Sequence, residues 1–463
     1  MNNHTSNHMS IYAQRRLTLL ESMPTASVAL VSGGTQQIRN RDVEFPFRVD
    51  SDFWYLTGFI EPDSVLVLIR SEVFERQALD EENKAGESNI HSLGHQAWLF
   101  VRPKDPEKEI WQGRRLGVDE APGQLGIDQA WSIDELDEQA PAFLVEAENL
   151  MISFGQLDEW SLRLADWLSG LKAQARKGVE LPGRISDLDS LLHEQRLIKS
   201  SDEIEWMRKA AQVSVQGHLA AMRVARAGGY EYQLQAELEH CFKRLGSERV
   251  AFNTIVATGE NACILHYTEN NAVLRSGDLV LIDAGAEWQG YAGDISHTFP
   301  VNGRFSLEQS QLYTCVLNAQ RAAIEQVKPG IAYNQMHQVV LQMLTKGLLD
   351  LGLLAGEVDQ LIKDQAVKRF FMHGTGHWLG MDVHDVGRYK INGDWRRFQP
   401  GMVVTVEPGL YVAPGSKDVD QKWWGIGIRI EDDVLVTETG SEVLTQGLPR
   451  SVEEIELWMQ NNQ

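Results

Sequence analysis

LVLIDAGAEWQGYAGDISHTFP, residues 279–300, contains two apolar, β-type runs separated by the short segment EWQG (287–290). This pattern predicts an antiparallel hairpin closed by a tight turn. If the first and last residues of that segment pair, Asp283 lies directly opposite Asp294 on one face of the hairpin. Two facing carboxylates in apolar strands repel each other, and burying them is costly unless a cation lies between them. The hairpin therefore suggests a metal site. The alternatives are that one aspartate faces solvent while the other caps the turn, or that a bulge changes the register.

Size, charge and cysteine content narrow the class of protein. The chain has 463 residues, of which 43% are apolar, enough to form at least two cores. Its 43 basic and 65 acidic residues give a net charge of -22, which argues against binding to nucleic acid or to an anionic membrane.

The three cysteines are widely spaced and form no Cys-x-x-Cys pattern. The N-terminus is polar, with no secretory-type apolar run, and no later stretch approaches about 20 consecutive apolar residues. We expect a cytoplasmic protein.

The N-terminal part is predicted to be an α/β domain. Residues 1–9 are polar and are expected to form a disordered tail, whereas helical and β-type patterns alternate over 10–175. The polar and charged segment 71–94 is interpreted as a surface loop or insertion. A basic, glycine-containing stretch, 176–199, is expected to link this domain to the next one.

The second predicted domain covers residues 200–440. It opens with a helix signal, because Ser200 and Glu203 have the spacing of a capping box and an apolar stripe at helical spacing follows. Further helical patterns flank largely antiparallel strands, which predicts an α+β domain. Residues 441–463 end in an acidic helical pattern and are expected to form a C-terminal tail.

Three histidines lie within twelve residues of the segment FMHGTGHWLGMDVHD (371–385). His373 and His377 have the i, i+4 spacing of a helical zinc pair, but two intervening glycines favour a loop or strand. The segment also lacks the glutamate of a His-Glu-x-x-His motif. A single histidine is more often a hydrogen-bonded core residue, whereas three in one glycine-rich stretch, the third being His384, favour a functional site.

Two glutamates close strand-like runs, Glu407 in MVVTVEPG and Glu431 in GIRIEDD. Either one alone would suggest a solvated strand end. Together with Asp283, Asp294 and one histidine they provide four carboxylates and an imidazole, a ligand set suited to two divalent ions such as Mn²⁺ or Co²⁺. Two metals about 3.5–4 Å apart can bridge a water and generate a hydroxide nucleophile, as in aminopeptidases and phosphatases.

The order of these residues and the surrounding IDAG, HGTGHWLG, VEPG and GIRIED segments resemble the dimetal pita-bread peptidases, most closely the bacterial aminopeptidase P (Xaa-Pro aminopeptidase) family. RVDSDFWYLTGF (48–59) and GRRLG (113–117) resemble the N-terminal domain of that family, which distinguishes it from the single-domain methionine aminopeptidases. The likeness covers nearly the whole chain. It implies a pita-bread catalytic domain preceded by a smaller α/β domain.

The resemblance also implies roles for particular residues. The metal ligands, for two divalent ions that we expect to be Mn²⁺, fall on Asp283, Asp294, His377, Glu407 and Glu431. His266 and His384 match histidines that bind substrate and stabilise charge on the scissile carbonyl. Glu407 matches a carboxylate that moves a proton between the attacking water and the leaving nitrogen.

The substrate's proline side is expected to contact His373, which matches a histidine placed there in the family. Tyr411 and apolar residues near Trp378 are further candidates for this pocket. Arg429 is expected to bind substrate or to support a metal-bound carboxylate, because it stands two residues before Glu431.

These implications predict a metallopeptidase that removes the N-terminal residue from peptides with proline at the second position, by a hydroxide bridging two divalent metals. One alternative is a prolidase, which shares the metal set but accepts only dipeptides. Another is a metal-free pita-bread module that binds peptides or proteins, against which the intact ligand set argues. The expected partners are Xaa-Pro peptides, with no nucleic acid and no membrane, and the chain is expected to form a homo-oligomer, a dimer or a tetramer.

Overall fold

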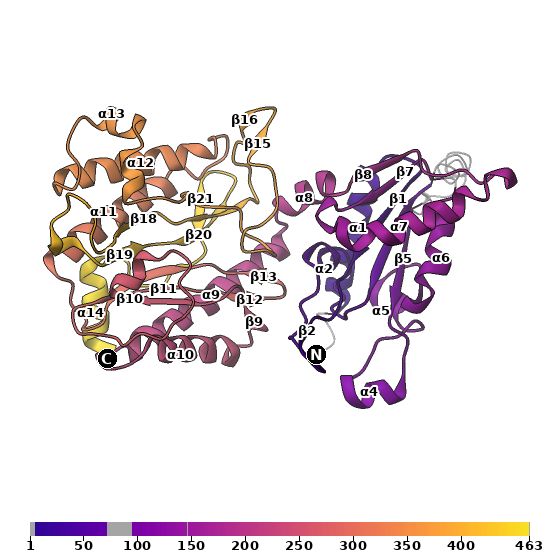
Figure 1. The fold of residues 1–463 in the computed structure, drawn as a ribbon, viewed down its shortest axis with the longest axis horizontal. Helices are drawn as coiled ribbons and strands as arrows, with labels where there is room; N and C mark the ends of the chain where they lie inside the picture. Colours follow the sequence, from indigo (N-terminus) through magenta and orange to yellow (C-terminus); the bar gives the residue numbers. More distant parts are fainter. Residues whose placement is uncertain (1–4, 72–94, 146, 463) are drawn as a thin grey trace. The chain divides into compact units, whose positions relative to one another are not determined.

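The computed structural model describes residues 5–71, 95–145 and 147–462. The chain divides into two compact units, Met1–Gln195 and Arg196–Gln463, each with its own hydrophobic core (Figure 1). Most of the expected surface loop at 71–94 lies outside the described residues. Among the helices of the described part of the chain, none combines the length and the apolar character needed to cross a membrane.

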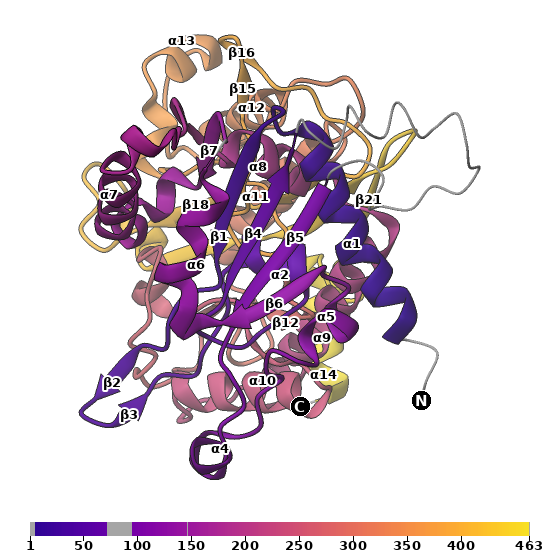
Figure 2. The ribbon, with the colours of Figure 1, turned by 90° about the vertical axis from the view of Figure 1, so that its right-hand side faces the viewer.

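A six-stranded mixed sheet forms the centre of the N-terminal unit. In sheet order the strands are β6 (Gln129–Ser132), β5 (His95–Val101), β4 (Val65–Arg70), β1 (Ser27–Ser32), β7 (Asn149–Ile152) and β8 (Arg184–Asp187), and β2 (Ile38–Asn40) and β3 (Val43–Glu44) form a separate ribbon. The helices are α1 (Thr5–Ser22), α2 (Ser51–Thr57), α4 (Pro106–Gln112), α5 (Ala121–Leu125), α6 (Leu136–Phe143), α7 (Leu157–Lys172) and α8 (Asp189–Leu197). Figure 2 shows α1 on one side of the sheet and α6 and α7 on the other. Every residue of β1 is therefore buried, as its apolar sequence predicts.

Two expected boundaries of this unit differ from the structure. The stretch 176–199, expected as a linker, contains strand β8 and helix α8, and the division between the two units falls after Gln195. Strand β8 pairs only with β7, at the edge of the sheet, so it needs no apolar alternation and leaves little signal in the sequence. Helix α1 begins at Thr5, inside the segment expected to be a disordered tail.

The C-terminal unit places short antiparallel strands between two helix pairs, α9 with α10 and α11 with α12 (Figure 1). The helices are α9 (Ser201–Val224), α10 (Glu231–Arg244), α11 (Leu307–Ile324), α12 (Asn334–Asp350), α13 (Val358–Lys363) and α14 (Val452–Asn462). The principal strands are β10 (Ile255–Thr258), β11 (Leu279–Asp283), β14 (Ser296–Pro300), β17 (Val403–Val406), β18 (Gly409–Val412), β19 (Ile426–Arg429) and β20 (Asp432–Val436). Shorter strands are β9 (Arg249–Val250), β12 (Ala286–Trp288), β13 (Tyr291–Ala292), β15 (Lys390–Ile391), β16 (Asp394–Trp395) and β21 (Ser441–Val443).

The predicted capping box is present at the start of α9. The Ser200 hydroxyl accepts from the Glu203 backbone N–H, and the Glu203 carboxylate accepts from the Ser200 N–H at 2.9 Å. At the other end of the unit, residues 441–463, expected as a tail, contain β21 and α14. Ile455 and Met459 of α14 are fully buried, so this segment belongs to the core of the unit.

The hairpin at 279–300 forms, but its predicted register is wrong by two residues. The turn consists of Gln289 and Gly290, both with positive φ (51° and 80°), as a tight two-residue hairpin turn of the primed type requires. Asp283 therefore pairs with Ser296. Asp294 stands two residues from that partner, as a diagonal neighbour of Asp283 on the same face, because side chains alternate with a period of two.

Candidate metal centre

A cavity of about 570 Å³ lies within the C-terminal unit. Its volume is in the range of small-molecule sites. Nine of the ten residues expected to form the site line it: His266, Asp283, Asp294, His373, His377, His384, Glu407, Arg429 and Glu431. Residues from segments more than 160 positions apart in sequence therefore meet at one place.

The ends of neighbouring strands bring the carboxylates together. Asp283 is the last residue of β11, and Asp294 lies in the short connection from β13 to β14. Glu407 lies between β17 and β18, and Glu431 lies between β19 and β20. Strand β17 pairs with β20, and β18 pairs with β19. The chain passes from the first pair to the second at Glu407 and returns at Glu431, so the two glutamates lie side by side.

His377 is held as a neutral ligand. Its Nδ1 lies 2.9 Å from the carbonyl oxygen of Trp378, which can only accept, so Nδ1 carries the proton. The Nε2 lone pair then faces the carboxylates, 3.6 Å from Oδ2 of Asp294 and 3.6 Å from Oε1 of Glu407. Burial lowers the pKa of His377 to about 4, which keeps the ring neutral near pH 7. A second hydrogen bond that fixes the tautomer is typical of metal-binding histidines.

Without a bound cation, the buried carboxylates repel one another when they are ionised. Burial, followed by repulsion from neighbouring carboxylates, raises the pKa of Asp294 and Glu431 well above their usual values. Burial also raises the pKa of Glu407 to about 8, although Arg429 opposes the shift. Buried carboxylates that repel one another favour protonation or a bound cation.

Unsatisfied oxygens show where a cation would fit. Oδ1 of Asp283 and Oδ1 of Asp294 are buried and have no hydrogen-bond partner among the described residues. Asp294, His377 and Glu431 each offer one ligand atom, and these atoms lie within 4.8 Å of one another. Buried polar atoms are normally paired, so the donor set, its geometry and its free lone pairs all fit a divalent metal.

Arg429 supports the ligands through three hydrogen bonds. Its guanidinium donates to Asp283 Oδ2 at 2.6 Å, to Ser296 Oγ at 2.8 Å and to the Tyr411 hydroxyl at 3.1 Å. Ser296 in turn donates to Oε2 of Glu431 at 2.7 Å. Arg429 thus orients two carboxylates, directly or through one serine, in agreement with the expected support of a metal-bound carboxylate.

Tyr411 lies behind the cavity wall. Its hydroxyl is 2.8 Å from Nε2 of His373, whose Nδ1 donates to the Gly374 carbonyl at 2.7 Å, so Tyr411 donates to Nε2. Tyr411 is 2% exposed and Trp378 is fully buried, and neither lines the cavity. The structure thus differs from the expectation that Tyr411 forms part of the wall of a substrate pocket, because its side chain packs into the core. The other expected substrate contacts, His266, His373, His384 and Arg429, line the cavity.

His266 and His384 are the two exposed histidines of the cavity. The His384 ring lies 4.3 Å from the His377 ring, centroid to centroid. Neither side chain has a hydrogen-bond partner among the described residues, so both are available to a bound molecule. Their expected role as substrate contacts rather than metal ligands stays a prediction.

Sequence reasoning missed Ser296 and several lining residues, including Phe252, Asn253, Leu265 and Thr268. Ser296 had a usable signal, because it faces Asp283 once the two-residue turn is placed correctly. The other four carry no signal, since their roles depend on how the segments around β10 fold toward the cavity.

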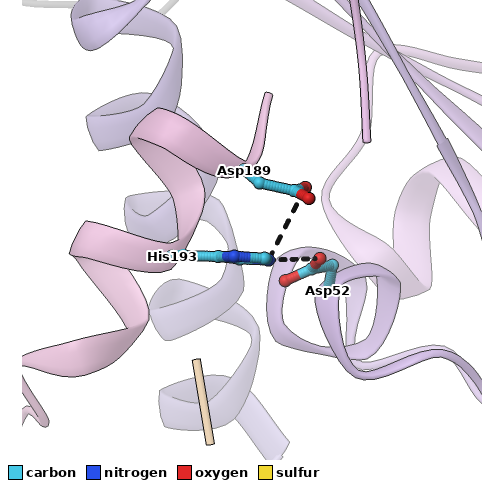
Figure 3. Close-up of side chains that lie close together, drawn as sticks. All are labelled: Asp52, Asp189 and His193. Atoms are coloured by element: carbon cyan, nitrogen blue, oxygen red, sulfur yellow. Dashed lines mark hydrogen bonds and ion pairs between the residues drawn. The ribbon is translucent and has the colours of Figure 1, made fainter. Parts of the chain in front are cut away.

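A second group of carboxylates and a histidine lies in the N-terminal unit. His193 on α8 places Nε2 3.2 Å from Oδ2 of Asp52 on α2 and 3.6 Å from Oδ1 of Asp189 (Figure 3). Ser153 also donates to Asp189 at 3.0 Å. These distances are those of an ion pair between α2 and α8 when His193 is protonated.

Comparison with known proteins agrees with this picture. The family model described as Metallopeptidase family M24 matches residues 205–438, and that of the Aminopeptidase P, N-terminal domain matches residues 12–152. The chain is 43% identical to the Xaa-Pro aminopeptidase of Escherichia coli over 97% of both chains. The solved structures of Pseudomonas aeruginosa aminopeptidase PepP and of Yersinia pestis proline aminopeptidase P II both superpose with a TM-score of 0.91. The Pseudomonas aeruginosa protein is 46% identical, and the match covers 98% of both chains. The Yersinia pestis protein is 43% identical, and the match covers 98% of this chain and 100% of that one.

These matches confirm the predicted architecture, a pita-bread domain preceded by a smaller α/β domain, and the predicted family resemblance. They cover both units and include every residue that lines the cavity. A family of metallopeptidases also accounts for the buried carboxylates, because a divalent cation would offset their repulsion. The chain belongs to metallopeptidase family M24.

Proposed function

We propose that this protein is a metal-dependent Xaa-Pro aminopeptidase that releases the first residue of peptides with proline at the second position. The observation that carries the proposal is that a buried group of mutually repelling carboxylates and two exposed histidines line one cavity. The first feature can hold metal and the second can hold a peptide. Similarity to Xaa-Pro aminopeptidases over nearly the whole chain supports this substrate class.

The proposed ligands of two divalent ions are Asp283, Asp294, His377, Glu407 and Glu431. We propose Mn²⁺, because oxygen-rich ligands with one imidazole and no thiolate suit this ion. When bound, the two ions would supply a water of lowered pKa as the nucleophile and would polarise the peptide carbonyl. They would also offset the repulsion among the four carboxylates.

The chain's own groups then act on the substrate. Glu407 accepts a proton from the attacking water and delivers it to the leaving nitrogen, because its carboxylate lines the cavity in which the substrate would bind. His266 and His384 donate hydrogen bonds to the substrate and stabilise the negative charge that develops on the scissile carbonyl oxygen. Both lie on the open side of the cavity, which a peptide can reach.

Specificity for proline is assigned to the His373 side of the cavity. The peptide nitrogen of proline carries no N–H, so the pocket beside it needs shape rather than a hydrogen-bond acceptor. Both ring nitrogens of His373 are already bonded, to the Gly374 carbonyl and to Tyr411, and burial lowers its pKa to about 3. The neutral ring can therefore present its carbon edge to the pyrrolidine ring.

The test compares three peptide series on the Mn²⁺-loaded protein. We expect release of the first residue from Xaa-Pro-Yaa, and no release from Xaa-Ala-Yaa or from N-acetylated Xaa-Pro-Yaa, because the free amino group should bind near the metal ions and Asp283. Comparable rates on the alanine and proline series would contradict proline specificity and leave a general metal aminopeptidase. Turnover of Xaa-Pro dipeptides alone would identify a prolidase, and a protein that binds peptides without bound metal or turnover would identify the non-enzymatic module.

The cellular setting is a separate proposal. The strongly acidic composition and the three unpaired cysteines support a cytoplasmic location. The resemblance to aminopeptidase P supports a homo-oligomer, a dimer or a tetramer. Light scattering coupled to size-exclusion chromatography would measure the number of subunits directly.

A further inference from the structure

The segment between β10 and β11 delivers one of the two exposed histidines to the cavity. Leu265, His266 and Thr268 of this segment line the cavity, together with Ile255 of β10. The His266 side chain has no hydrogen-bond partner among the described residues. Its position over the cavity therefore depends on the backbone that carries it.

Glu231 holds that backbone on both sides of His266. Its Oε1 accepts from the Thr258 backbone N–H at 2.7 Å and from the Asn261 side-chain amide at 3.2 Å. Its Oε2 accepts from the Tyr267 hydroxyl and from the Ala272 backbone N–H, both at 2.8 Å. One carboxylate thus ties the start, the middle and the end of the segment together.

The carboxylate is itself held firmly. Glu231 is fully buried and is the first residue of α10, where the helix N-terminus favours a negative charge. Leu234, Leu238 and Phe242 anchor the same helix in the core. A buried charge that accepts four hydrogen bonds is stable in place, whereas the loss of one acceptor would leave a buried donor unsatisfied.

We propose that Glu231 is the positioning residue for His266: it fixes the loop that presents this histidine to the substrate. The inference rests on the proposed function of His266 as a substrate contact. Glu231 itself does not line the cavity, so it acts only through the loop. Tyr267, which follows His266 directly, is the nearest of the four points of attachment.

The same helix offers a matched control. Glu239, two turns further along α10, accepts from the Thr254 hydroxyl and from the Gln235 side-chain amide, each at 2.8 Å. These contacts hold the approach to β10 directly and reach the His266 loop only through Gln235, which accepts from the Asn270 side chain. Glu239→Gln removes a charge of the same kind from the same helix, so it separates a general effect on α10 from an effect on the loop.

The first experiment measures Glu231→Gln and Glu239→Gln in the Mn²⁺-loaded protein. Glutamine keeps the size of Glu231 but replaces one accepting oxygen with an N–H₂ group that faces two donors. We expect kcat on an Xaa-Pro-Yaa peptide to fall about 10- to 100-fold in Glu231→Gln, as for a misplaced catalytic group, with wild-type metal content. Hydrogen exchange of the peptide covering 258–272 should become faster. Glu239→Gln should keep wild-type kcat and metal content and should change the exchange of 258–272 less than Glu231→Gln does. Unchanged kcat and exchange in Glu231→Gln would overturn the proposal, and so would loss of bound metal.

A double-mutant cycle with His266→Ala decides whether the effect passes through His266. If Glu231 acts through this histidine, Glu231→Gln should reduce kcat much less in the His266→Ala background than in wild type. An equal reduction in both backgrounds would overturn the proposal. Wild-type kcat in His266→Ala alone would instead contradict the proposed role of His266. Tyr267→Phe, which removes one of the four bonds and leaves the Glu231 charge, provides a milder second variant with the same expected cycle.

Discussion

Each unit of this protein contains a group of carboxylates with a histidine, but the C-terminal group is more deeply buried and contains more carboxylates than the N-terminal group. In the N-terminal group, which is only partly buried, Nε2 of His193 lies 3.2 Å from Asp52 and 3.6 Å from Asp189, within ion-pair distance. In the C-terminal group, the lone pair of His377 faces the carboxylates, and Oδ1 of Asp294 has no partner among the described residues. Burial, the number of carboxylates and the fixed tautomer of His377 therefore distinguish the two groups better than residue types or unsatisfied oxygens do, because Oδ1 of Asp189 also lacks a hydrogen-bond partner among the described residues.

The largest expected effect on bound metal and turnover is at His377, whose Nε2 lone pair faces the carboxylates. His377→Ala should deplete bound metal and reduce turnover by more than about 100-fold, because it removes a ligand and not only a supporting contact. Its control is His384→Ala, whose ring is adjacent but exposed. That variant should keep both metals and lose about 100-fold in kcat. Metal analysis together with turnover tests this pair, and the reverse pattern of metal loss would show that the ligand has been assigned to the wrong histidine.

An intermediate effect is expected in the stability of the metal-free protein as the pH changes. The pKa of Glu407 in the folded protein is about 8, above its ordinary value of 4.5, so the folded state retains a proton that the unfolded state releases. Protonated Glu407 therefore adds to the free energy of unfolding at low pH, and this contribution is lost as the pH rises toward 8. The neutral histidines oppose this trend only below about pH 6.5, so the clearest window is from about pH 6.5 to 8.

Within that window, we expect the free energy of unfolding of the metal-free protein to fall by about 2 kcal/mol from Glu407 alone. Asp294 and Glu431 shift in the same direction. Chemical denaturation at several pH values, with chelator or with Mn²⁺, measures this. The metal-loaded protein should lose less stability, because the cation stabilises the ionised carboxylates. Stability that rises with pH in the metal-free protein would contradict the described carboxylate cluster.

The smallest effect is expected in the N-terminal group. Asp189→Asn weakens the contact with His193, while the asparagine can still accept from Ser153. Because the contact is only partly buried, the free energy of unfolding should change by less than about 1 kcal/mol, with no change in bound metal per chain. Loss of a metal equivalent in this variant would show that the N-terminal group binds a cation after all and would break the contrast between the two groups.

Local patterns in the sequence predicted the catalytic domain to different degrees. Apolar runs that end in a single carboxylate identified Asp283, Glu407 and Glu431, because a charge at the end of a buried strand is costly without a partner. The capping box at Ser200 also formed as predicted. Strand β8 was not recognised, and the helical pattern of α14 was assigned to a tail, since a polar edge strand and a terminal helix show their role only through the neighbours that they pack against.

The sequence by itself determined the residue types of the site and their placement on strand ends and glycine-rich loops, since these follow from the period of each element and from the cost of burying charge. Only the tertiary structure decided which atoms face one another. The register of the hairpin depended on Gln289 adopting a positive φ, and the tautomer of His377 depended on the carbonyl beside it. The support from Tyr411, Ser296 and Glu231 depended on long-range packing. Such contacts join residues far apart in the chain, so no local pattern records them.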